Sequence, residues 1–337
     1  MKERKTVVDI RILGGYQKNK NTGVGKYVHD LADMLNASGF TTEVIYEKFS
    51  DNFVKRFFER FLFLPLRIRK SSRSVMLTIL PDESYSFLLP SIASIQKSII
   101  VHDVRPLSLA GGGYSLLREY FLKIQNSIFL NLADVIIVPS QFTRMSLGRG
   151  IVIPNVFELS QKRFDAHLPA ELKNKNYLLY VGTNQYRKNF VTADKVSKLA
   201  KEKYNLEFVC VGNLQPSQGV AYSKVNDMQL SALYQNAFAL VNPSLFEGFG
   251  RVVVEAQKNG CPVISTSCSA LGEVLGESAL LVANPTDSTD YLDCIHSLFD
   301  FKYRSSLIDK GYENSKRFEK HYLVVKSLID CTVLKRY

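Results

Sequence analysis

The residues best suited to chemistry are two glutamates, Glu247 and Glu255, in the segment Asn242–Ile264. The pattern of this segment predicts a strand, then the turn Gly248–Gly250, then a helix that ends near Asn259. Glycines let a backbone approach a ligand closely, and N–H groups at a helix start attract anionic or hydroxyl oxygens. Both carboxylates should lie near the carboxyl ends of parallel strands, where doubly wound folds bind their ligands. Two carboxylates at that edge can bind vicinal hydroxyl groups, whereas each alone is more simply a cap or a solvated side chain.

Two neighbouring cations, Arg187 and Lys188, follow the predicted strand Tyr177–Gly182. The planar guanidinium offers parallel donors and the ammonium a compact charge, and together they suit a diphosphate. Such a pair can stabilise the negative charge that grows on a departing diphosphate. The alternative is a solvated basic pair at the start of a helix.

The N-terminal half contains two further motifs. Gly23 and Gly25 lie in a turn that opens the first predicted helix. With Glu47 beyond the second predicted strand, this turn is similar to a dinucleotide fingerprint, but the third glycine is missing and the loop is too long. His102 stands at the carboxyl end of another predicted strand. A lone histidine is usually structural, so its role depends on the wider pattern.

Short β-branched runs alternate with helical periodicity in both halves of the chain, which is typical of parallel βαβ units. A chain of 337 residues has the length of two domains. We therefore expect two Rossmann-like, doubly wound α/β domains that face a cleft, residues 1–160 and 161–315, followed by a helical segment, 316–337. The segment 155–176 is predicted to link the domains. The predicted strands are Val7–Leu13, Thr42–Tyr46, Ser98–His102, Val135–Pro139, Tyr177–Gly182, Leu206–Gly212, Ala239–Asn242, Pro262–Ser265 and Ala279–Val282.

The composition narrows the class of protein. With 46% hydrophobic and 22% charged residues, the chain is predicted to fold compactly, and its net charge of +11 favours anionic partners. The five cysteines form no CxxC pair and do not cluster with histidine, which argues against a disulfide framework or a zinc site and favours a reducing cytoplasm. Asp9 and Arg11 interrupt the N-terminal apolar stretch, so we expect no signal sequence. The longest strongly apolar run, Phe61–Leu66, is too short to span a membrane.

The segment 53–73 interleaves aromatic and basic side chains. It contains five phenylalanines and seven lysines or arginines, but only one acid. Such a segment can bury its rings at the headgroup boundary while its cations meet anionic lipid. A partly buried helix of the N-terminal domain is an equal alternative, and an acceptor carried on a membrane lipid would favour the first interpretation.

Taken in order, several pieces of the C-terminal half resemble retaining glycosyltransferases of family 4, whose hallmark is two glutamates separated by seven residues. These pieces are Pro243-Ser244, Glu247-Gly248-Phe249-Gly250, Glu255-Ala256 and Gly260-Cys261-Pro262-Val263-Ile264. The resemblance runs from Gly23 to about Val282 and includes the Arg-Lys pair, the Gly-x-Gly-x-Tyr turn and the His-Asp piece. Gln257 departs from the Met or Leu that is common in the family, which should affect packing more than donor binding.

This resemblance implies a GT-B architecture and a role for each motif. The first glutamate and the glycine turn would contact the transferred sugar, and the second glutamate would hold the ribose hydroxyls. The Arg-Lys pair would bind the donor diphosphate, the histidine would lie near the sugar, and the amides of the N-terminal turn would face the donor phosphates. The last helix would return to the first domain. The candidate catalytic residues are Glu247, His102, Arg187 and Lys188. The candidate donor-binding residues are Gly23, Gly25, Gly182, Arg187, Lys188, Val225, Glu247, Gly248, Phe249, Gly250, Arg251 and Glu255.

The implied activity is retaining transfer of a hexose from a nucleotide sugar, with the leaving phosphate assisting deprotonation of the acceptor. No Asp-x-Asp motif is present, and we expect neither a metal nor a cofactor. GDP-mannose is the favoured donor, followed by dTDP-rhamnose and UDP-hexoses. The acceptor would be a saccharide or lipid-linked saccharide of bacterial-type surface polysaccharide synthesis, such as that of lipopolysaccharide. The expected location is the cytoplasm, with a peripheral position on the inner face of the plasma membrane.

The sequence gives less support to three other functions. A sugar-nucleotide epimerase of the same fold would need dimer-forming and acid-base features that are not recognisable here. A noncatalytic nucleotide-sugar-binding subunit does not need the intact glutamate pair. A nucleic-acid-binding protein would explain only the net charge, so we expect no nucleic acid partner.

Overall fold

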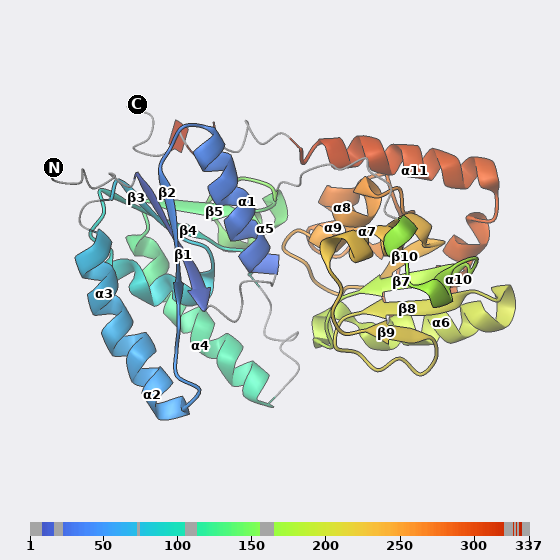
Figure 1. The fold of residues 1–337 in the computed structure, drawn as a ribbon, viewed down its shortest axis with the longest axis horizontal. Coiled ribbons are helices and arrows are strands. Elements are labelled where there is room, and N and C mark those ends of the chain that lie inside the picture. The colour runs from blue at the N-terminus through green and yellow to red at the C-terminus, as the bar shows by residue number, and fades with distance from the viewer. Residues whose placement is uncertain are drawn as a thin grey trace. The chain divides into compact units, whose positions relative to one another are not determined.

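The computed structural model describes residues 9–16, 23–72, 75–104, 113–155 and 165–319, together with positions 326, 328, 330 and 331 (Figure 1). The described residues form two compact units. The first unit holds the described residues up to Val104, those from Tyr114 to 155, and the four positions after 320. The second unit holds residues 165–319 together with Gly113.

The first unit is built on a sheet of six parallel strands in the order β2-β1-β3-β4-β5-β6. The strands are β1 (Ile10–Tyr16), β2 (Thr42–Glu47), β3 (Leu77–Leu80), β4 (Gln96–Ile100), β5 (Val135–Val138) and β6 (Ile151–Val152). The strand order reverses between β1 and β3, because β2 lies on one side of β1 and all later strands lie on the other. The predicted strands are present with shifted ends, whereas β3 and β6 were not predicted.

The second unit has its own sheet of six parallel strands, in the order β12-β11-β10-β7-β8-β9. The strands are β7 (Tyr177–Val181), β8 (Glu207–Val211), β9 (Val220–Tyr222), β10 (Ala239–Asn242), β11 (Val263–Thr266) and β12 (Leu280–Val282). Here the order reverses between β7 and β10. Only β9 was not predicted. Two doubly wound α/β units, as expected from the sequence, are therefore confirmed.

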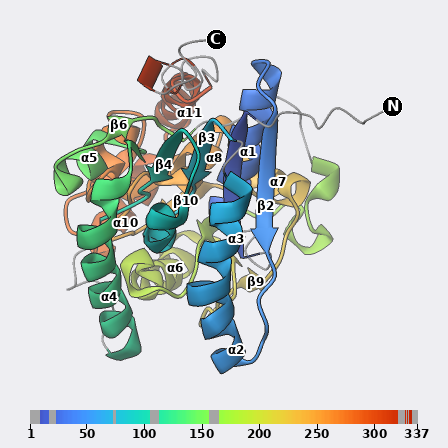
Figure 2. The same cartoon turned by 90° about the vertical axis from the view of Figure 1, so that its left-hand side faces the viewer.

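Helices connect the strands of each unit (Figures 1 and 2). Those of the first unit are α1 (Gly23–Ala37), α2 (Phe53–Phe58), the π-helical turn η2 (Glu59–Phe63), α3 (Leu64–Ser71), the 3-10 helix η4 (Glu83–Ser91), α4 (Gly113–Phe129), η6 (Leu130–Leu132) and α5 (Gln141–Leu147). Those of the second unit are η7 (Asp165–His167), η8 (Ala170–Leu172), η9 (Tyr186–Lys188), α6 (Phe190–Tyr204), α7 (Asp227–Asn236), α8 (Arg251–Lys258), α9 (Leu271–Leu275), α10 (Ser288–Ser297) and α11 (Phe301–Lys316).

Each sheet is buried on both faces. Successive side chains of a strand point to opposite faces. Thus Ile12 of β1 joins one core with Leu31 of α1, whereas Leu13 joins another with Leu64 of α3. Burial on both faces explains why strands such as β5 are apolar throughout.

Local sequence also places the loops that follow the strands. Gly212 has a φ of +137°, and a Cβ atom there would lie 2.0 Å from the carbonyl oxygen of Gly182. Only glycine allows the loops after β7 and β8 to approach this closely. Before α7, the Asn226 side chain accepts from the N–H of Gln229, and the Gln229 side chain accepts from the N–H of Asn226. This capping box fixes where α7 begins.

The predicted domain boundary at residue 160 lies outside the described residues. The predicted boundary between residues 315 and 316 falls inside helix α11, which continues to Lys316. Of the predicted last segment, Phe318 packs in a core of the second unit and Leu328 in a core of the first, and after residue 319 the structure describes positions 326, 328, 330 and 331.

Candidate active site

The loops after β7 and β10 bring together three charged side chains that the sequence singled out. Arg187 Nη1 lies 3.0 Å from Glu247 Oε2, and Lys188 Nζ lies 2.5 Å from Glu247 Oε1. The three side chains are only 15%, 16% and 9% exposed. Because β7 and β10 are the strands at which the sheet order reverses, this cluster lies where doubly wound folds bind ligands.

Hydrogen bonds between the two loops fix the cations. The carbonyl of Arg187 accepts from the N–H of Leu245 at 2.7 Å, and the guanidinium donates to the carbonyl of Phe246 at 3.2 Å. Asn189, in the left-handed region at a φ of +51°, donates its side-chain amide to the carbonyl of Pro243 at 3.1 Å. The two cations are therefore presented together by the backbone of both loops.

Two serines that sequence reasoning missed position Glu247. The Ser244 hydroxyl donates to Glu247 Oε1 at 2.9 Å, and the Ser269 hydroxyl oxygen accepts from the N–H of Glu247 at 2.7 Å. Ser244 belongs to the Pro-Ser piece of the motif, so a signal for it was present. Ser269, in the left-handed region at a φ of +55°, lies in a segment without any such pattern.

The charges around Glu247 decide its protonation. Burial raises the pKa of Glu247, but the charges of Lys188 and Arg187 and the hydrogen bonds from Lys188 and Ser244 outweigh burial and hold the pKa below its ordinary value. The carboxylate is therefore ionised at neutral pH and pairs with both cations, which leaves the cluster with one net positive charge. An anionic ligand that binds these cations must share them with the carboxylate or displace it.

Glu255 lies apart from this cluster, in α8. Its Oε1 is 3.6 Å from Arg251 Nε, and its Oε2 accepts from the hydroxyl of Tyr234 at 3.5 Å. The Glu255 side chain is 22% exposed. Burial, followed by the charge of Glu255, raises the pKa of Tyr234 well above its ordinary value, so the phenol stays a hydrogen-bond donor. The structure thus pairs Glu255 with Arg251, which was also a predicted donor-binding residue.

The turn before α8 requires glycine at its last position. Gly250 has a φ of +93°, and a Cβ atom there would lie 2.7 Å from a methyl carbon of Leu271. Phe249 is buried in the core, with its ring edge-on to that of Phe318 at 5.1 Å. Only the backbone of Phe249 is therefore suited to a ligand contact. The roles of Gly248 and Gly250 remain predictions.

Two further predicted donor residues lie elsewhere in the second unit. Gly182 directly follows β7, and a Cβ atom there would lie 2.8 Å from the hydroxyl of Tyr180. Val225 lies just before α7 and packs, partly buried, against the core. Packing therefore accounts for the lack of a side chain at Gly182 and for the apolar side chain at Val225, and their contacts with a donor remain predictions.

In the first unit, His102 follows β4. Its ring Nε2 lies 2.7 Å from the carbonyl oxygen of Pro81. Because a carbonyl only accepts, Nε2 is the ring nitrogen that donates in this hydrogen bond. The ring also packs edge-on against that of Tyr27 at 5.4 Å. Tyr27 belongs to α1, which begins at Gly23 and contains the buried Gly25, so the predicted glycine turn and His102 lie at the same edge of this sheet.

Glu83 is a titratable group of this edge that sequence reasoning missed. It follows β3, and its Oε2 accepts from the N–H of His102 at 3.1 Å. Burial, together with the charges of Asp82 and Asp103, raises the pKa of Glu83 well above its ordinary value. No motif surrounds it, so only the structure reveals these neighbours.

The aromatic and basic segment 53–72 packs by one side only; Arg73 lies outside the described residues. Leu64 and Ile68 are buried in the core of the first unit. Most of its other large apolar side chains are at least half exposed: Val54, Phe57, Phe58, Leu62, Phe63 and Leu66. The segment is thus a surface helix that combines features of both interpretations.

Metal sites and membrane spans can be judged for the described ranges. Within them, His, Cys, Asp and Glu form no group of three that would hold a metal ion. In the same part of the chain, no helix has the length and apolarity to cross a bilayer. Metal-independent activity remains a prediction.

Comparisons with known proteins agree with this geometry. Residues 175–300 match the family described as Glycosyl transferases group 1. An O-antigen chain mannosyltransferase of Salmonella typhimurium is 27% identical over 219 residues, a stretch that spans 60% of this chain and 60% of that protein. The structure of a sucrose-phosphate synthase from Thermosynechococcus elongatus superposes with a TM-score of 0.78 at 18% identity, over 96% of this chain and 98% of the other. The Anabaena protein HepE in complex with UDP and glucose gives 0.69 at 15% identity, again over 96% and 98%.

These comparisons establish the fold of the protein and the domain that contains the candidate site. The fold is that of the GT-B glycosyltransferases, with two Rossmann-like units. Within the second unit, residues 175–300 form a Glycosyl transferases group 1 domain, which contains Arg187, Lys188, Glu247 and Glu255.

Proposed function

We propose that this protein is a retaining glycosyltransferase that transfers a hexose from a nucleotide sugar to a hydroxyl group of a saccharide or lipid-linked saccharide. The observation that carries the proposal is the convergence of Arg187 and Lys188 on the buried Glu247, between the loops after β7 and β10. Two nearly buried cations held by one carboxylate form a site that can accept a diphosphate by exchange of anions. The Glycosyl transferases group 1 domain supports the assignment of that diphosphate to a sugar donor.

In this proposal the bond between the anomeric carbon and the donor phosphate oxygen breaks, and the electron pair leaves with the nucleoside diphosphate. Arg187 and Lys188 stabilise the charge that grows on the leaving group. The acceptor hydroxyl oxygen forms the new bond on the same face of the sugar, and its proton passes to the departing phosphate. Glu247 contacts the transferred sugar and Glu255 the ribose hydroxyls.

Mannose is the first choice for the transferred sugar, because the relative from Salmonella is described as a mannosyltransferase. GDP-mannose is then the donor, and dTDP-rhamnose and UDP-hexoses follow. The acceptor is a growing surface polysaccharide, as a saccharide or a lipid-linked saccharide. The exposed rings and cations of residues 53–72 support docking on an anionic membrane surface, where such an acceptor would be found.

The test is a transfer assay with the full chain. A panel of nucleotide sugars is first screened by thermal shift. The donors that bind are then incubated with saccharide and lipid-linked saccharide acceptors, and the masses of the products are measured by mass spectrometry. We expect the acceptor to gain one hexose, with retained anomeric configuration by NMR and with undiminished turnover in the presence of a chelator.

Each rival gives a different outcome. An epimerase would consume or convert the donor without any acceptor, and a noncatalytic subunit would bind the donor without turnover. Inverted configuration in the product would overturn the retaining mechanism while leaving transfer intact.

A further inference from the structure

Helix α4 (Gly113–Phe129) is amphipathic, but it buries polar side chains and exposes apolar ones. Glu119 and Gln125 are buried, at 7% and 5% exposure, whereas a stripe of large apolar side chains faces outward. The stripe consists of Leu116, Leu117, Tyr120, Phe121, Ile124 and Ile128, which are 41–70% exposed. A surface helix of a globular protein normally buries its apolar stripe, and a contiguous exposed patch marks an interaction site.

The buried polar side chains of α4 explain how the helix is held. Gln125 donates to the carbonyl of Ser84 at 3.2 Å and to the hydroxyl of Ser86 at 2.9 Å. The Ser86 hydroxyl in turn donates to Asn126 Oδ1 at 2.8 Å. Helix α4 is therefore fixed to η4 (Glu83–Ser91) by hydrogen bonds, which leaves its apolar side for another partner.

The same short helix, η4, also holds the segment α2–η2–α3. Arg60 donates to the carbonyl of Ser84, the group that accepts from Gln125, at 3.3 Å. The ring of Phe61 packs against that of Phe87 at 4.9 Å. The segments 54–70 and 116–129 thus both contact η4. Both carry exposed apolar side chains, and Figure 2 labels α2, α3 and α4.

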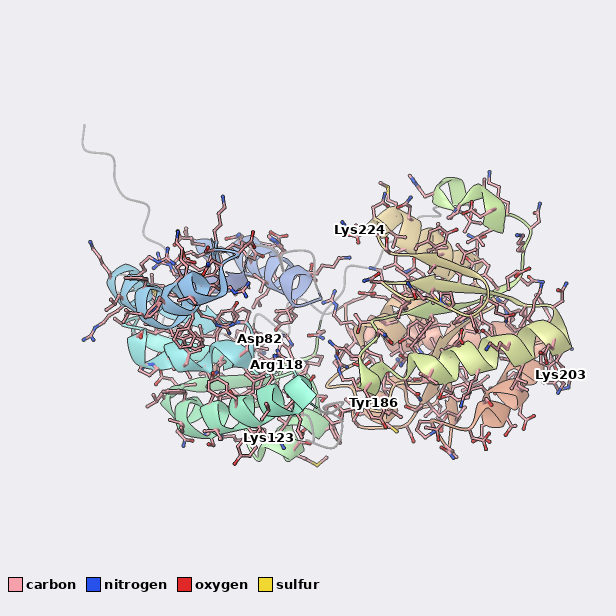
Figure 3. All side chains as sticks on the ribbon, turned by 90° about the horizontal axis from the view of Figure 1, so that it is seen from below. Asp82, Arg118, Lys123, Tyr186, Lys203 and Lys224 are labelled. Atoms are coloured by element: carbon pink, nitrogen blue, oxygen red, sulfur yellow. The ribbon has the colours of Figure 1, made fainter. Side chains whose placement is uncertain are left out.

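The charges on these neighbouring segments have one sign. Every exposed charged side chain of residues 54–70 and 116–129 is basic; these are Lys55, Arg67, Arg69, Lys70, Arg118 and Lys123. Figure 3 labels Arg118 and Lys123 on α4. Like charges on an isologous interface would repel, so a second copy of this chain is a poor occupant. Apolar side chains flanked by cations instead match an anionic lipid surface, in which rings enter the acyl boundary and cations meet headgroups.

We propose that α4 and the segment α2–η2–α3 form one membrane-docking surface that inserts into an anionic bilayer. The proposal extends the docking expected for residues 53–73 by a second, independent helix. Docking through two helices fixes the orientation of the first unit on the membrane, because a single helix leaves rotation about its axis free.

The chain contains no tryptophan, so a single introduced tryptophan reports its own environment. We would compare Leu117→Trp in α4 and Phe63→Trp in η2 with Phe301→Trp, a matched control in the second unit that is 78% exposed. Vesicles of phosphatidylcholine alone and with phosphatidylglycerol are added. The first two reporters should shift their emission to the blue with acidic vesicles only and be quenched by brominated acyl chains, whereas the control should change little.

Binding affinity is tested with Leu117→Glu/Phe121→Glu, whose side chains are 70% and 54% exposed and whose replacement leaves the core untouched. The affinity for acidic vesicles should fall at least about tenfold, since each large side chain that leaves an apolar phase costs about this factor. The control Phe301→Glu/Tyr303→Glu makes the same change of charge outside the surface and should remain within about twofold of the parent.

Three outcomes would overturn the proposal. A shift at residue 63 without one at 117 would leave docking to α2–η2–α3 alone. An equal loss in both Glu variants would reduce the effect to net charge. A lipid-free dimer that Leu117→Glu/Phe121→Glu converts to a monomer, without vesicle binding by the parent, would make the surface an interface between copies. Transfer to a water-soluble acceptor, measured in parallel, tells failure of docking from failure of the proposed activity.

Discussion

Both sheets place a glutamate beside the strands where their order reverses, one buried and one partly buried, but the two carboxyl groups have opposite surroundings. Glu247 in the second unit is held by Arg187 and Lys188, and its pKa lies below the ordinary value although burial raises it. Glu83 in the first unit is partly buried beside Asp82 and Asp103, and desolvation and these charges raise its pKa well above that value. The fold offers an edge of the same kind in both units, and the neighbouring charges decide whether the carboxyl group there is an anion.

This contrast separates two kinds of site. A carboxylate with two cations forms a cluster that keeps one positive charge, and its cations can exchange one anion for another, which suits an anionic donor. A carboxyl group with a raised pKa stays neutral over a wider pH range and can donate a hydrogen bond. Because the structure assigns these properties to different units, substitutions in each unit test the contrast separately.

The largest effect is expected from removal of both cations. The Arg187→Ala/Lys188→Ala variant should lower turnover by at least roughly a hundredfold, as for other lost charge-stabilising groups. Steady-state transfer assays measure the loss, and circular dichroism shows whether the fold persists. Lys302→Ala/Lys310→Ala, which removes two exposed cations from α11, is the matched control. Near-normal turnover of the first variant would rule out the role in leaving-group stabilisation.

Replacing Glu247 by glutamine should test the exchange of anions. The Glu247→Gln variant leaves two nearly buried cations uncompensated and should lose roughly 3 kcal/mol of unfolding free energy at neutral pH, the lower end for a broken buried ion pair. Because the folded-state pKa is depressed, the carboxylate contributes stability above the unfolded pKa and loses it as pH falls through the folded pKa. Parent and variant should therefore converge in acid when unfolding is measured across pH.

A nucleoside diphosphate should stabilise Glu247→Gln more than it stabilises the parent, because its phosphates replace the missing negative charge. Thermal shift with GDP, dTDP and UDP measures this difference. If every nucleotide raised the melting temperature of both proteins equally, the cations would not be the diphosphate site.

A smaller effect is expected at the second glutamate of the pair. If Glu255 accepts two ribose hydroxyl hydrogen bonds, Glu255→Gln should weaken nucleotide binding by about 1.5–3 kcal/mol. Its pairing with Arg251 and Tyr234 offers a competing, purely structural role, which would lower stability and leave binding unchanged. Calorimetric titration of the preferred nucleoside diphosphate distinguishes the two. Glu313→Gln, at a side chain that is 71% exposed, is the control.

The comparison of the two sheet edges also shows which residues of the site can be predicted from the sequence. Arg187, Lys188 and Glu247 were found because each follows an apolar strand in a recognisable local motif, and parallel strands bring such loops to one edge. Glu83 was missed because its surroundings come from loops far apart in the chain. The exposed apolar face of helix α4 was not predicted for a related reason. Its side chains suit a helix, but only tertiary packing shows that Glu119 and Gln125 face inward. Strand β6 has two residues, too few for periodicity. Strands β3 and β9, with four and three residues, are as long as the predicted β5 and β12, so their length does not explain why the pattern failed there.

The smallest expected effect is at Glu83, and it has the opposite sign. An acid whose folded-state pKa is raised destabilises the folded state as pH rises from the unfolded pKa toward the folded one, because only the unfolded chain ionises freely there.

The variant Glu83→Gln keeps the shape of the side chain and removes its ionisable group. At neutral pH it should therefore raise the melting temperature by about 2–4 °C, which corresponds to about 1 kcal/mol in a domain of this size. Below pH 4, where both states of the parent are protonated, the gain should vanish. Thermal scans from pH 3 to 8 measure this, with Glu202→Gln on the exposed side of α6 as the control. A variant less stable than the parent at neutral pH would show that Glu83 is held there as an anion, which would remove the contrast with Glu247.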